Sequence, residues 1–239
     1  MTRHQGSLAL VTGGSAGLGR ALVHALHDRG WTVVTDGRDA VRLADATRDL
    51  DQVAAVPGDV ADPEHRADLV SAVRRLAGPG GGLDLLVHNA STLGPLPMPA
   101  LADLHTGSLA AVWETNAGAP HALSRSLVPE LTSAGGLLVG ISSDAAVQHY
   151  EGWGAYGAAK AALDHLILTF GAETGLTAYA VDPGDMDTAL HRDAEPGEDL
   201  SHLPKPETVA AQLLALIDAR PRTGRHRAAD FAPTLTGVA

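Results

Sequence analysis

The chain has 239 residues, of which 45% are hydrophobic and 19% are charged, which predicts one globular domain over residues 1–239. Its 17 Lys and Arg residues against 28 Asp and Glu residues give a formal charge of −11, which argues against nucleic-acid and anionic-membrane partners. There is no cysteine, so disulfides and thiolate chemistry are excluded, and no apolar run is long enough to span a bilayer, so we expect a cytoplasmic protein.

Short apolar runs alternate with longer segments of helical pattern. Six runs are nearly all apolar, as in parallel strands covered on both faces: Leu8–Thr12, Thr32–Thr35, Val53–Val56, Asp84–Val87, Leu137–Ile141 and Thr177–Val181. Between them, Gly30 indicates a helix end after Arg29, and Asp62–Glu64 indicates a capped helix start. Pro206–Glu207 opens another helix that ends near Ala219. This order predicts an α/β fold with a doubly wound, Rossmann-like parallel sheet in three α/β/α layers.

A glycine-rich turn follows the first predicted strand and precedes a helix. Its glycines allow the backbone to approach a pyrophosphate, and the helix N-terminus supplies free amides and a favourable dipole. By spacing alone the turn could merely reverse the chain, because short glycine motifs match by accident. Its place between strand and helix favours a dinucleotide site. The residues assigned to that site are Gly13, Ser15, Ala16, Gly17, Leu18 and Gly19.

The end of the second predicted strand selects the cofactor. Both an acidic residue, Asp36, and a basic residue, Arg38, are present, so the register decides between the ribose hydroxyl of NAD and the phosphate of NADP. Counting from Gly19 places Gly37 against the ribose, with Arg38 next to it and Asp36 on the opposite face. The sequence therefore favours NADP(H). A shift of the strand register by one residue would turn Asp36 toward the ribose and favour NAD(H). On the sequence alone, Arg38 could also be a solvated loop residue with no role in binding.

A tyrosine and a lysine stand four residues apart in a helical segment, on one face. Tyr156 could exchange a proton with a carbonyl oxygen, and the ammonium of Lys160 is expected to lower the pKa of the phenol. Ser143 follows the predicted strand Leu137–Ile141 and could polarise the same oxygen. Each residue alone also suits a packing or surface role, but their order downstream of the glycine turn favours catalysis.

Together these motifs resemble the single-domain branch of the short-chain dehydrogenase/reductase family over nearly the whole chain. The glycine turn is similar to that family's TGxxxGxG motif. The other matching positions are Asp59-Val60 at the adenine, His88-Asn89-Ala90-Ser91 at the NNAG motif, the Asn116, Ser143, Tyr156 and Lys160 tetrad, and Pro183-Gly184 with Thr188 at the nicotinamide.

The resemblance implies an enzyme that transfers hydride between a nicotinamide and a carbonyl or alcohol substrate. Tyr156 would exchange the proton, and Lys160 would lower its pKa and hold the nicotinamide ribose. Ser143 would orient the substrate oxygen, and Asn116 would hold a water that relays protons. The cofactor site would also include Asp59, Val60, Asn89, Ala90, Ser91, Pro183, Gly184 and Thr188. No metal is implied, and a homotetramer or homodimer is expected.

The chain departs from the family pattern at several positions. His88 and Ser91 replace Asn and Gly of NNAG, and Ala16 stands where some NADP-preferring relatives carry a basic residue, so Arg38 would act alone. Residues 185–204 fall where the family has a substrate lid, which we expect to be mobile and to exclude water on closing. The last strand is expected near Arg225–Asp230.

Two other functions share part of this sequence pattern. A catalytically silent cofactor-binding sensor or scaffold would share the fold, but the intact tetrad argues against it. A sugar-nucleotide epimerase or dehydratase would share the Tyr-xxx-Lys pair, but needs a larger C-terminal substrate domain and another glycine spacing. The working hypothesis is ketone reduction by NADPH. The expected pocket, Ser91–Leu96, Asp144–Trp153 and the lid, mixes apolar and polar side chains and leaves the substrate open.

Overall fold

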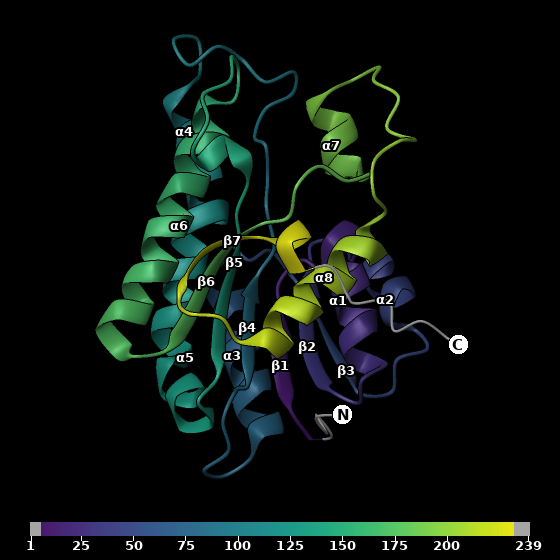
Figure 1. Ribbon diagram of the computed structural model, residues 1–239, viewed down its shortest axis with the longest axis vertical. Coiled ribbons are helices and arrows are strands. Elements are labelled where there is room, and N and C mark those ends of the chain that lie inside the picture. The colour runs from purple at the N-terminus through teal and green to yellow at the C-terminus, as the bar shows by residue number, and fades with distance from the viewer. Residues whose placement is uncertain (1–5, 232–239) are drawn as a thin grey trace.

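Seven parallel strands form one sheet in the computed structural model, which describes residues 6–231 (Figure 1). The strand order is β3-β2-β1-β4-β5-β6-β7, so the direction of winding reverses between β1 and β4. The strands are β1 (Leu8–Val11), β2 (Thr32–Gly37), β3 (Val53–Pro57), β4 (Leu85–His88), β5 (Leu137–Ile141), β6 (Thr177–Asp182) and β7 (Gly224–Arg227). The predicted doubly wound sheet is confirmed.

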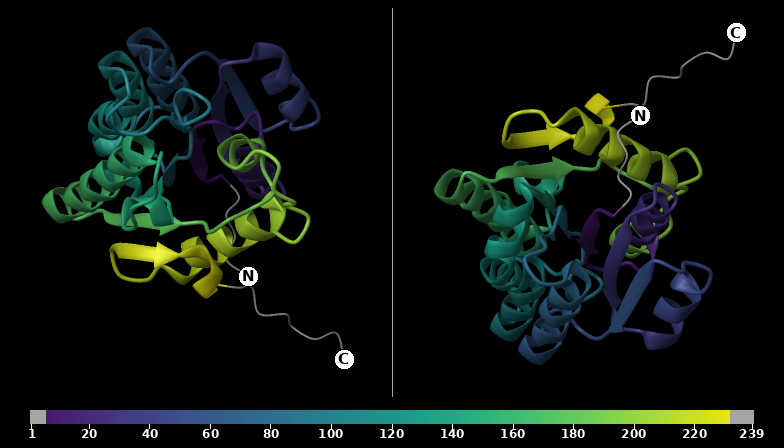
Figure 2. Two further views of the ribbon diagram at one scale, coloured as in Figure 1. Left: turned by 90° about the horizontal axis from the view of Figure 1, so that it is seen from above. Right: turned by 90° about the horizontal axis from the view of Figure 1, so that it is seen from below.

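Helices cover both faces of the sheet, which gives the predicted three layers (Figure 2). One face carries α1 (Gly17–His27), α2 (Ala40–Thr47) and α8 (Pro206–Ala219); the other carries α3 (Pro63–Ala77), α5 (Ala119–Ala134) and α6 (Gly154–Thr174). At the C-terminal ends of the strands, α4 (Thr106–Trp113) runs through a π-helical turn (Glu114–Gly118) into α5, and α7 (Ala189–Ala194) stands apart at the top right of Figure 1. Short 3₁₀ turns span Asp144–Ala146 and Ala228–Phe231.

The central strands β1, β4 and β5 are mostly apolar because both of their faces are buried. In β1, Ala9 and Val11 pack toward α1 and α8, whereas Leu8 and Leu10 pack toward α3, α5 and α6. All four side chains are buried. Burial of this kind supplies most of the driving force for folding, and it explains why apolar runs rather than alternating patterns mark the strands.

Most predicted helix boundaries are confirmed. Asp62 caps α3 by accepting a hydrogen bond from the amide of Glu64 at 2.9 Å, and α8 begins at Pro206. Helix α1 ends two residues earlier than expected, at His27, because the amide of Gly30 already bonds the His27 carbonyl at 2.8 Å. The last strand is also shorter than predicted. It ends at Arg227, and the 3₁₀ turn replaces the rest. None of the helices between residues 6 and 231 combines the length and apolarity that a membrane crossing requires.

Candidate active site

A cavity of about 610 Å³ lies at the C-terminal edge of the sheet, where the strand order reverses. Ligands bind at this point in open α/β sheets, and the volume suits an organic cofactor with part of a substrate. Every residue that the sequence assigned to the cofactor lines this cavity, with the exception of Tyr156. Within the described range, no three His, Asp or Glu side chains cluster in a way that could hold a metal ion.

The glycine turn is fixed by the loop that follows β4. The hydroxyl of Thr12 accepts hydrogen bonds from the amides of Asn89 and Ala90, both at 3.0 Å, and the Asn89 side chain donates to the Thr12 carbonyl at 2.8 Å. A Cβ on Gly19 would lie 2.2 Å from the carbonyl oxygen of Gly13, so only glycine fits there. The turn therefore has a single conformation, with its backbone against the cavity.

The N-terminus of α1 faces this cavity without a side-chain cap. Its N-cap residue is Ala16, which offers no side-chain acceptor to the first amides of the helix. Uncapped amides and the helix dipole attract an anion. The close-packed glycines and these amides fit the pyrophosphate of a dinucleotide.

The side chains at the end of β2 alternate as predicted. Asp36 is 1% exposed, and its carboxylate accepts a hydrogen bond from the amide of Gly13 at 2.6 Å and contacts His65 Nε2 at 3.1 Å. Gly37 faces the other side, where a Cβ would lie 2.8 Å from the Cβ of Ser15. Because both Asp36 oxygens already have partners in the protein, this carboxylate is not free to bind a ribose.

Two arginines line the cavity near the end of β2. One is the predicted Arg38, which is exposed, and the other is Arg42 in the first turn of α2. Sequence reasoning missed Arg42, although its spacing of four residues from Arg38 is a signal that could have found it. Asp59 and Val60 also line this end, and the Asp59 carboxylate accepts a hydrogen bond from the amide of Ala61 at 2.9 Å.

Tyr156 and Lys160 lie in the first two turns of α6. Lys160 is 2% exposed, and its ammonium donates a hydrogen bond to the Ile141 carbonyl at the end of β5 over 2.8 Å. The same nitrogen lies 5.5 Å from the centre of the Tyr156 ring. Trp153 packs edge-on against that ring with centroids 5.6 Å apart. The ring is thus held between an apolar wall and a buried cation.

Burial dominates the pKa values of this pair. It raises the pKa of Tyr156 to about 12, against the opposing effect of the Ser91 and Ser143 hydroxyls. Burial also lowers the pKa of Lys160 to about 8, against the opposing charge of Asp164. The sequence led us to expect that Lys160 lowers the pKa of Tyr156 below its ordinary value. In the structure the pKa of Tyr156 is raised instead. Desolvation of the phenol outweighs the hydrogen bonds from the two serines.

Ser143 begins the 3₁₀ turn after β5. Its hydroxyl accepts a hydrogen bond from the amide of Ala145 at 3.1 Å and donates to a carboxylate oxygen of Asp144 at 3.0 Å. The second oxygen of Asp144 accepts from the hydroxyl of Tyr150 at 2.7 Å. Although partial burial acts to raise it, the hydrogen bonds from Tyr150 and Ser143 hold the pKa of Asp144 below its usual value. The sequence had not indicated that a carboxylate holds the Ser143 proton.

Asn116 lies in the π-helical turn and is 1% exposed. Its side-chain oxygen accepts a hydrogen bond from the amide of Thr92 at 2.9 Å, and its side-chain nitrogen donates to the Thr92 carbonyl at 2.8 Å. Both ends of the side chain are therefore used to hold the loop after β4. The predicted role in binding a water stays a prediction.

One arginine that sequence reasoning missed lies beneath the site. Arg225 on β7 donates hydrogen bonds to the Ser143 carbonyl at 2.8 Å and to the Asp164 carboxylate at 3.1 Å, and it contacts Asp182 at 3.4 Å. Asp182 in turn accepts a hydrogen bond from the amide of Gly184 at 3.0 Å. A charged residue within a predicted strand of a buried sheet is a signal that could have drawn attention to Arg225.

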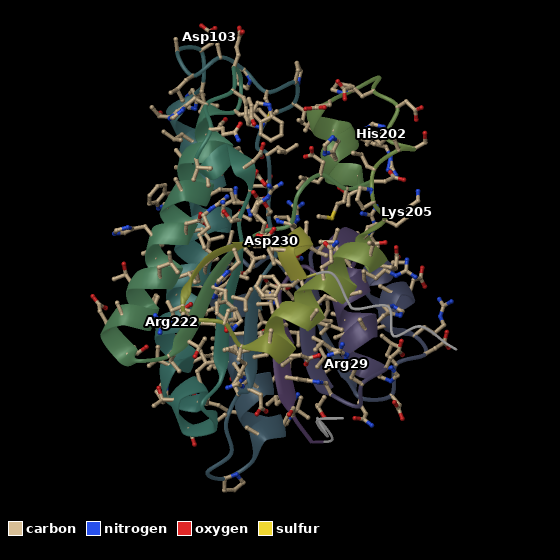
Figure 3. All side chains as sticks on the ribbon, viewed as in Figure 1. Arg29, Asp103, His202, Lys205, Arg222 and Asp230 are labelled. Atoms are coloured by element: carbon tan, nitrogen blue, oxygen red, sulfur yellow. The ribbon has the colours of Figure 1, made fainter. Side chains whose placement is uncertain are left out.

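The segment predicted as a lid reaches over the glycine turn. Thr188 caps α7 by accepting from the amide of His191 at 3.2 Å, and its methyl group would lie 3.5 Å from a Cβ on Gly17. Asp187 pairs with Arg192 at 2.9 Å and with Lys205, which lies at the base of the segment in Figure 3. That this segment serves as a mobile lid stays a prediction.

His88, at the first position of the NNAG-like segment, is buried beneath the loop. Its Nε2 lies 2.8 Å from the hydroxyl of Ser124 on α5. Burial lowers the pKa of His88 to about 3, so the ring is neutral at physiological pH. Its contacts link β4 to α5 and place it away from the cavity.

Comparisons with known proteins agree with this geometry. Residues 7–199 match the model of the short chain dehydrogenase family. An uncharacterized oxidoreductase of Saccharomyces cerevisiae is 32% identical over 189 residues, which are 77% of this chain and 72% of the yeast protein. A short chain dehydrogenase structure from Escherichia coli, described as complexed with NADPH, has a TM-score of 0.84 and 27% identity and covers 94% of this chain and 97% of its own.

A further solved structure, of a Shigella flexneri short chain dehydrogenase described as complexed with NADP, has a TM-score of 0.83 and 27% identity, with coverage of 93% and 96%. The family match spans most of the chain. The protein therefore belongs to the short chain dehydrogenase family and is an oxidoreductase of that family.

Proposed function

We propose that the protein is an NADP(H)-dependent reductase that interconverts a ketone or aldehyde with an alcohol, with Tyr156 as the acid–base catalyst. The observation that carries the proposal is the meeting of three groups: Lys160 lines a cavity that fits a dinucleotide, the Tyr156 ring lies beside Lys160, and the Ser143 hydroxyl acts on the Tyr156 phenol. These three groups come from two neighbouring elements, α6 and the turn after β5, which the sheet holds rigidly.

In the proposed reaction, the bound nicotinamide supplies or accepts the hydride. Tyr156 donates its proton to the carbonyl oxygen as that oxygen gains negative charge. A pKa of about 12 keeps the phenol protonated at neutral pH, so it is ready to act as an acid. The charge of Lys160, whose ammonium lies 5.5 Å from the centre of the Tyr156 ring, then stabilises the phenolate that remains, because both residues are buried and Coulomb interactions are stronger away from water. The Ser143 hydroxyl turns from Asp144 to the substrate oxygen.

The preference for NADP over NAD rests on the end of β2. Asp36 is committed to Gly13 and His65, so an acidic group for the free ribose hydroxyl is not offered there. Arg38 and Arg42 line the cavity instead, and guanidinium groups pair well with phosphate. Two structural neighbours described as complexes with NADP and NADPH support the same choice.

The substrate end of the site combines an apolar wall with one charge. Leu93, Trp153 and Leu190 pack around Tyr156, and the carboxylate of Asp144 stands beside Ser143. An anionic substrate would be repelled by Asp144, and a small hydrophilic one would leave the wall uncovered. We therefore propose a neutral carbonyl compound with an apolar group next to the reacting carbon.

A homodimer or homotetramer is proposed as the working state, and a cytoplasmic location stays a prediction. Two large apolar side chains on α4 are exposed, Leu109 at 38% and Trp113 at 48%, and α4 packs beside α6. Exposed apolar side chains that lie close together on a helix commonly mark an interface. Light scattering coupled to gel filtration measures the mass directly, and a monomer would contradict this part of the proposal.

The first experiment is a fluorescence titration of the purified protein with NADPH and NADH, beside Arg38→Ala. We expect tighter binding of NADPH, with the preference lost in the variant. A carbonyl panel with NADPH then compares the wild type with Tyr156→Phe, which should bind cofactor normally but lose turnover. Binding of NADPH without turnover on any carbonyl would favour the silent sensor or scaffold, and persistent activity of Tyr156→Phe would refute the acid–base role.

A further inference from the structure

Ser91 occupies the last position of the NNAG-like segment, where the resemblance expects a glycine without a side chain. Its residue lines the cavity, and its hydroxyl oxygen is buried. Within residues 6–231 this oxygen makes no hydrogen bond of good geometry, but it faces the Tyr156 phenol closely enough to act as a donor that opposes the rise of the Tyr156 pKa. A buried hydroxyl without a direct partner is uncommon, and at a cavity wall it indicates a group that a ligand completes.

The backbone on both sides of Ser91 is fixed. The amide of Ala90 donates to the Thr12 hydroxyl at 3.0 Å, which ties the segment to the glycine turn. The amide and carbonyl of Thr92 bond the side chain of Asn116 at 2.9 Å and 2.8 Å. The backbone position of Ser91 is therefore set by anchors on both sides, at Ala90 and at Thr92. A donor held in this way costs little reorganisation when charge develops beside it.

The two serines beside Tyr156 differ in what already holds them. The Ser143 hydroxyl donates to Asp144 at 3.0 Å and accepts from the amide of Ala145 at 3.1 Å. It must leave the carboxylate before it can donate to a substrate. Ser91 has no carboxylate partner within the described part of the chain, and its hydroxyl acts on the Tyr156 phenol instead. Of the two hydroxyls, the one on Ser91 can thus donate beside Tyr156 without first leaving a carboxylate.

We propose that the Ser91 hydroxyl donates a hydrogen bond to the same substrate oxygen that Tyr156 protonates, as a second donor beside Ser143. The inference rests on the proposed function, since it requires a carbonyl oxygen at Tyr156. The oxygen gains negative charge as hydride arrives at carbon, so a hydrogen bond to it is stronger in the transition state than in the ground state. Ser91 is then a catalytic residue rather than a part of the cofactor cradle alone.

The test compares Ser91→Ala and Ser91→Gly with the wild type in carbonyl reduction by NADPH. We expect kcat to fall by roughly 10- to 100-fold with a much smaller change in KM, because the lost hydrogen bond forms mainly in the transition state. Ser91→Gly restores the family residue, so it guards against a variant that fails to fold. Ser124→Ala serves as the matched control, since it removes a buried serine hydroxyl outside the cavity and should leave kcat unchanged.

An NMR titration of isotope-labelled tyrosine gives a second readout that does not depend on turnover. Removal of the Ser91 hydroxyl should raise the pKa of Tyr156 further, whereas Ser124→Ala should not move it. Equal kcat in wild type, Ser91→Ala and Ser91→Gly would overturn the proposal. A wild type that binds NADPH but reduces no carbonyl would instead refute the proposed function, so the two failures are distinguishable.

Discussion

The guanidinium of Arg225 donates a hydrogen bond to the backbone carbonyl of Ser143 over 2.8 Å, across the end of the intervening strand β6. The same side chain contacts Asp164 on α6 and Asp182 at the end of β6. One residue on β7 therefore joins the three elements that carry Ser143, the Tyr156–Lys160 pair and the turn at Gly184. The geometry of the proposed catalytic groups therefore depends on β7, which contributes no residue to the cavity wall.

Arg225→Gln should lower both stability and catalysis. The change leaves the carboxylates of Asp164 and Asp182 without their cation, and breaking a largely buried ion pair costs about 3 kcal/mol in free energy of unfolding. We expect kcat to fall with little change in NADPH affinity, because Ser143 loses its support while the glycine turn does not. Urea denaturation and steady-state kinetics measure the two effects. Arg227→Gln, on the exposed end of the same strand, is the control, and an equal loss in that variant would contradict the specific role of Arg225.

Lys160 should make the stability of the protein rise with pH. Burial lowers its pKa from 10.5 to about 8, so between these values the unfolded chain binds more protons than the folded chain. The free energy of unfolding should therefore increase from about pH 8 upward, by about 2.5 kcal/mol at pH 10. Above that, Tyr156 acts in the opposite direction, because its pKa is raised to about 12 and the folded state then holds the extra proton.

Denaturation of wild type and Lys160→Met across this pH range isolates the effect. All other titrating groups are shared, so the difference in stability between the two proteins reports on Lys160 alone. The wild type gains stability from Lys160 between pH 7 and pH 10 and the variant does not. The stability of Lys160→Met relative to the wild type should therefore be higher near pH 7 than near pH 10. A difference that stays flat across the range would show that Lys160 titrates normally in the folded protein.

The sequence predicts the sheet and the cavity well because both depend on local patterns. Apolar runs mark buried strands, and the glycine spacing between β1 and α1 requires a particular backbone. The register at Asp36 and Gly37 follows from the alternation of side chains along a strand. These features need only neighbouring residues, so they can be read from the chain itself.

The features that the sequence did not predict join residues that lie far apart in the chain. The contact between Arg225 and Ser143 spans 82 positions, and that between Asn116 and Thr92 spans 24. The pKa of Tyr156 was expected to fall because the nearby Lys160 was visible in the sequence, whereas the degree of burial was not. Desolvation depends on the whole packing around a group, and it reversed the sign of the expected shift.

Asn116→Ala should destabilise the protein and disturb the loop that carries Ser91. The substitution removes two buried hydrogen bonds and leaves the amide and carbonyl of Thr92 unpaired, which costs about 2–4 kcal/mol in free energy of unfolding. Thermal or urea denaturation measures the loss. If Asn116 served only to hold a relay water, kcat would fall with stability unchanged, so a normal denaturation midpoint would contradict the positioning role.

Arg42→Ala should weaken the binding of NADPH about tenfold while leaving that of NADH nearly unchanged, because one cation beside the ribose phosphate contributes about 1.4 kcal/mol. Arg42 lines the cavity beside Arg38, whereas Arg48, at the far end of α2, pairs with Asp45 on the surface. Arg48→Ala is therefore the matched control for the loss of one charge. The loss of NADPH affinity in Arg42→Ala should also be smaller at high salt, because salt screens the attraction between Arg42 and the phosphate in the wild type. Equal weakening of NADPH and NADH would indicate that Arg42 contacts the adenine or merely supports α2, and the phosphate would then rest on Arg38 alone.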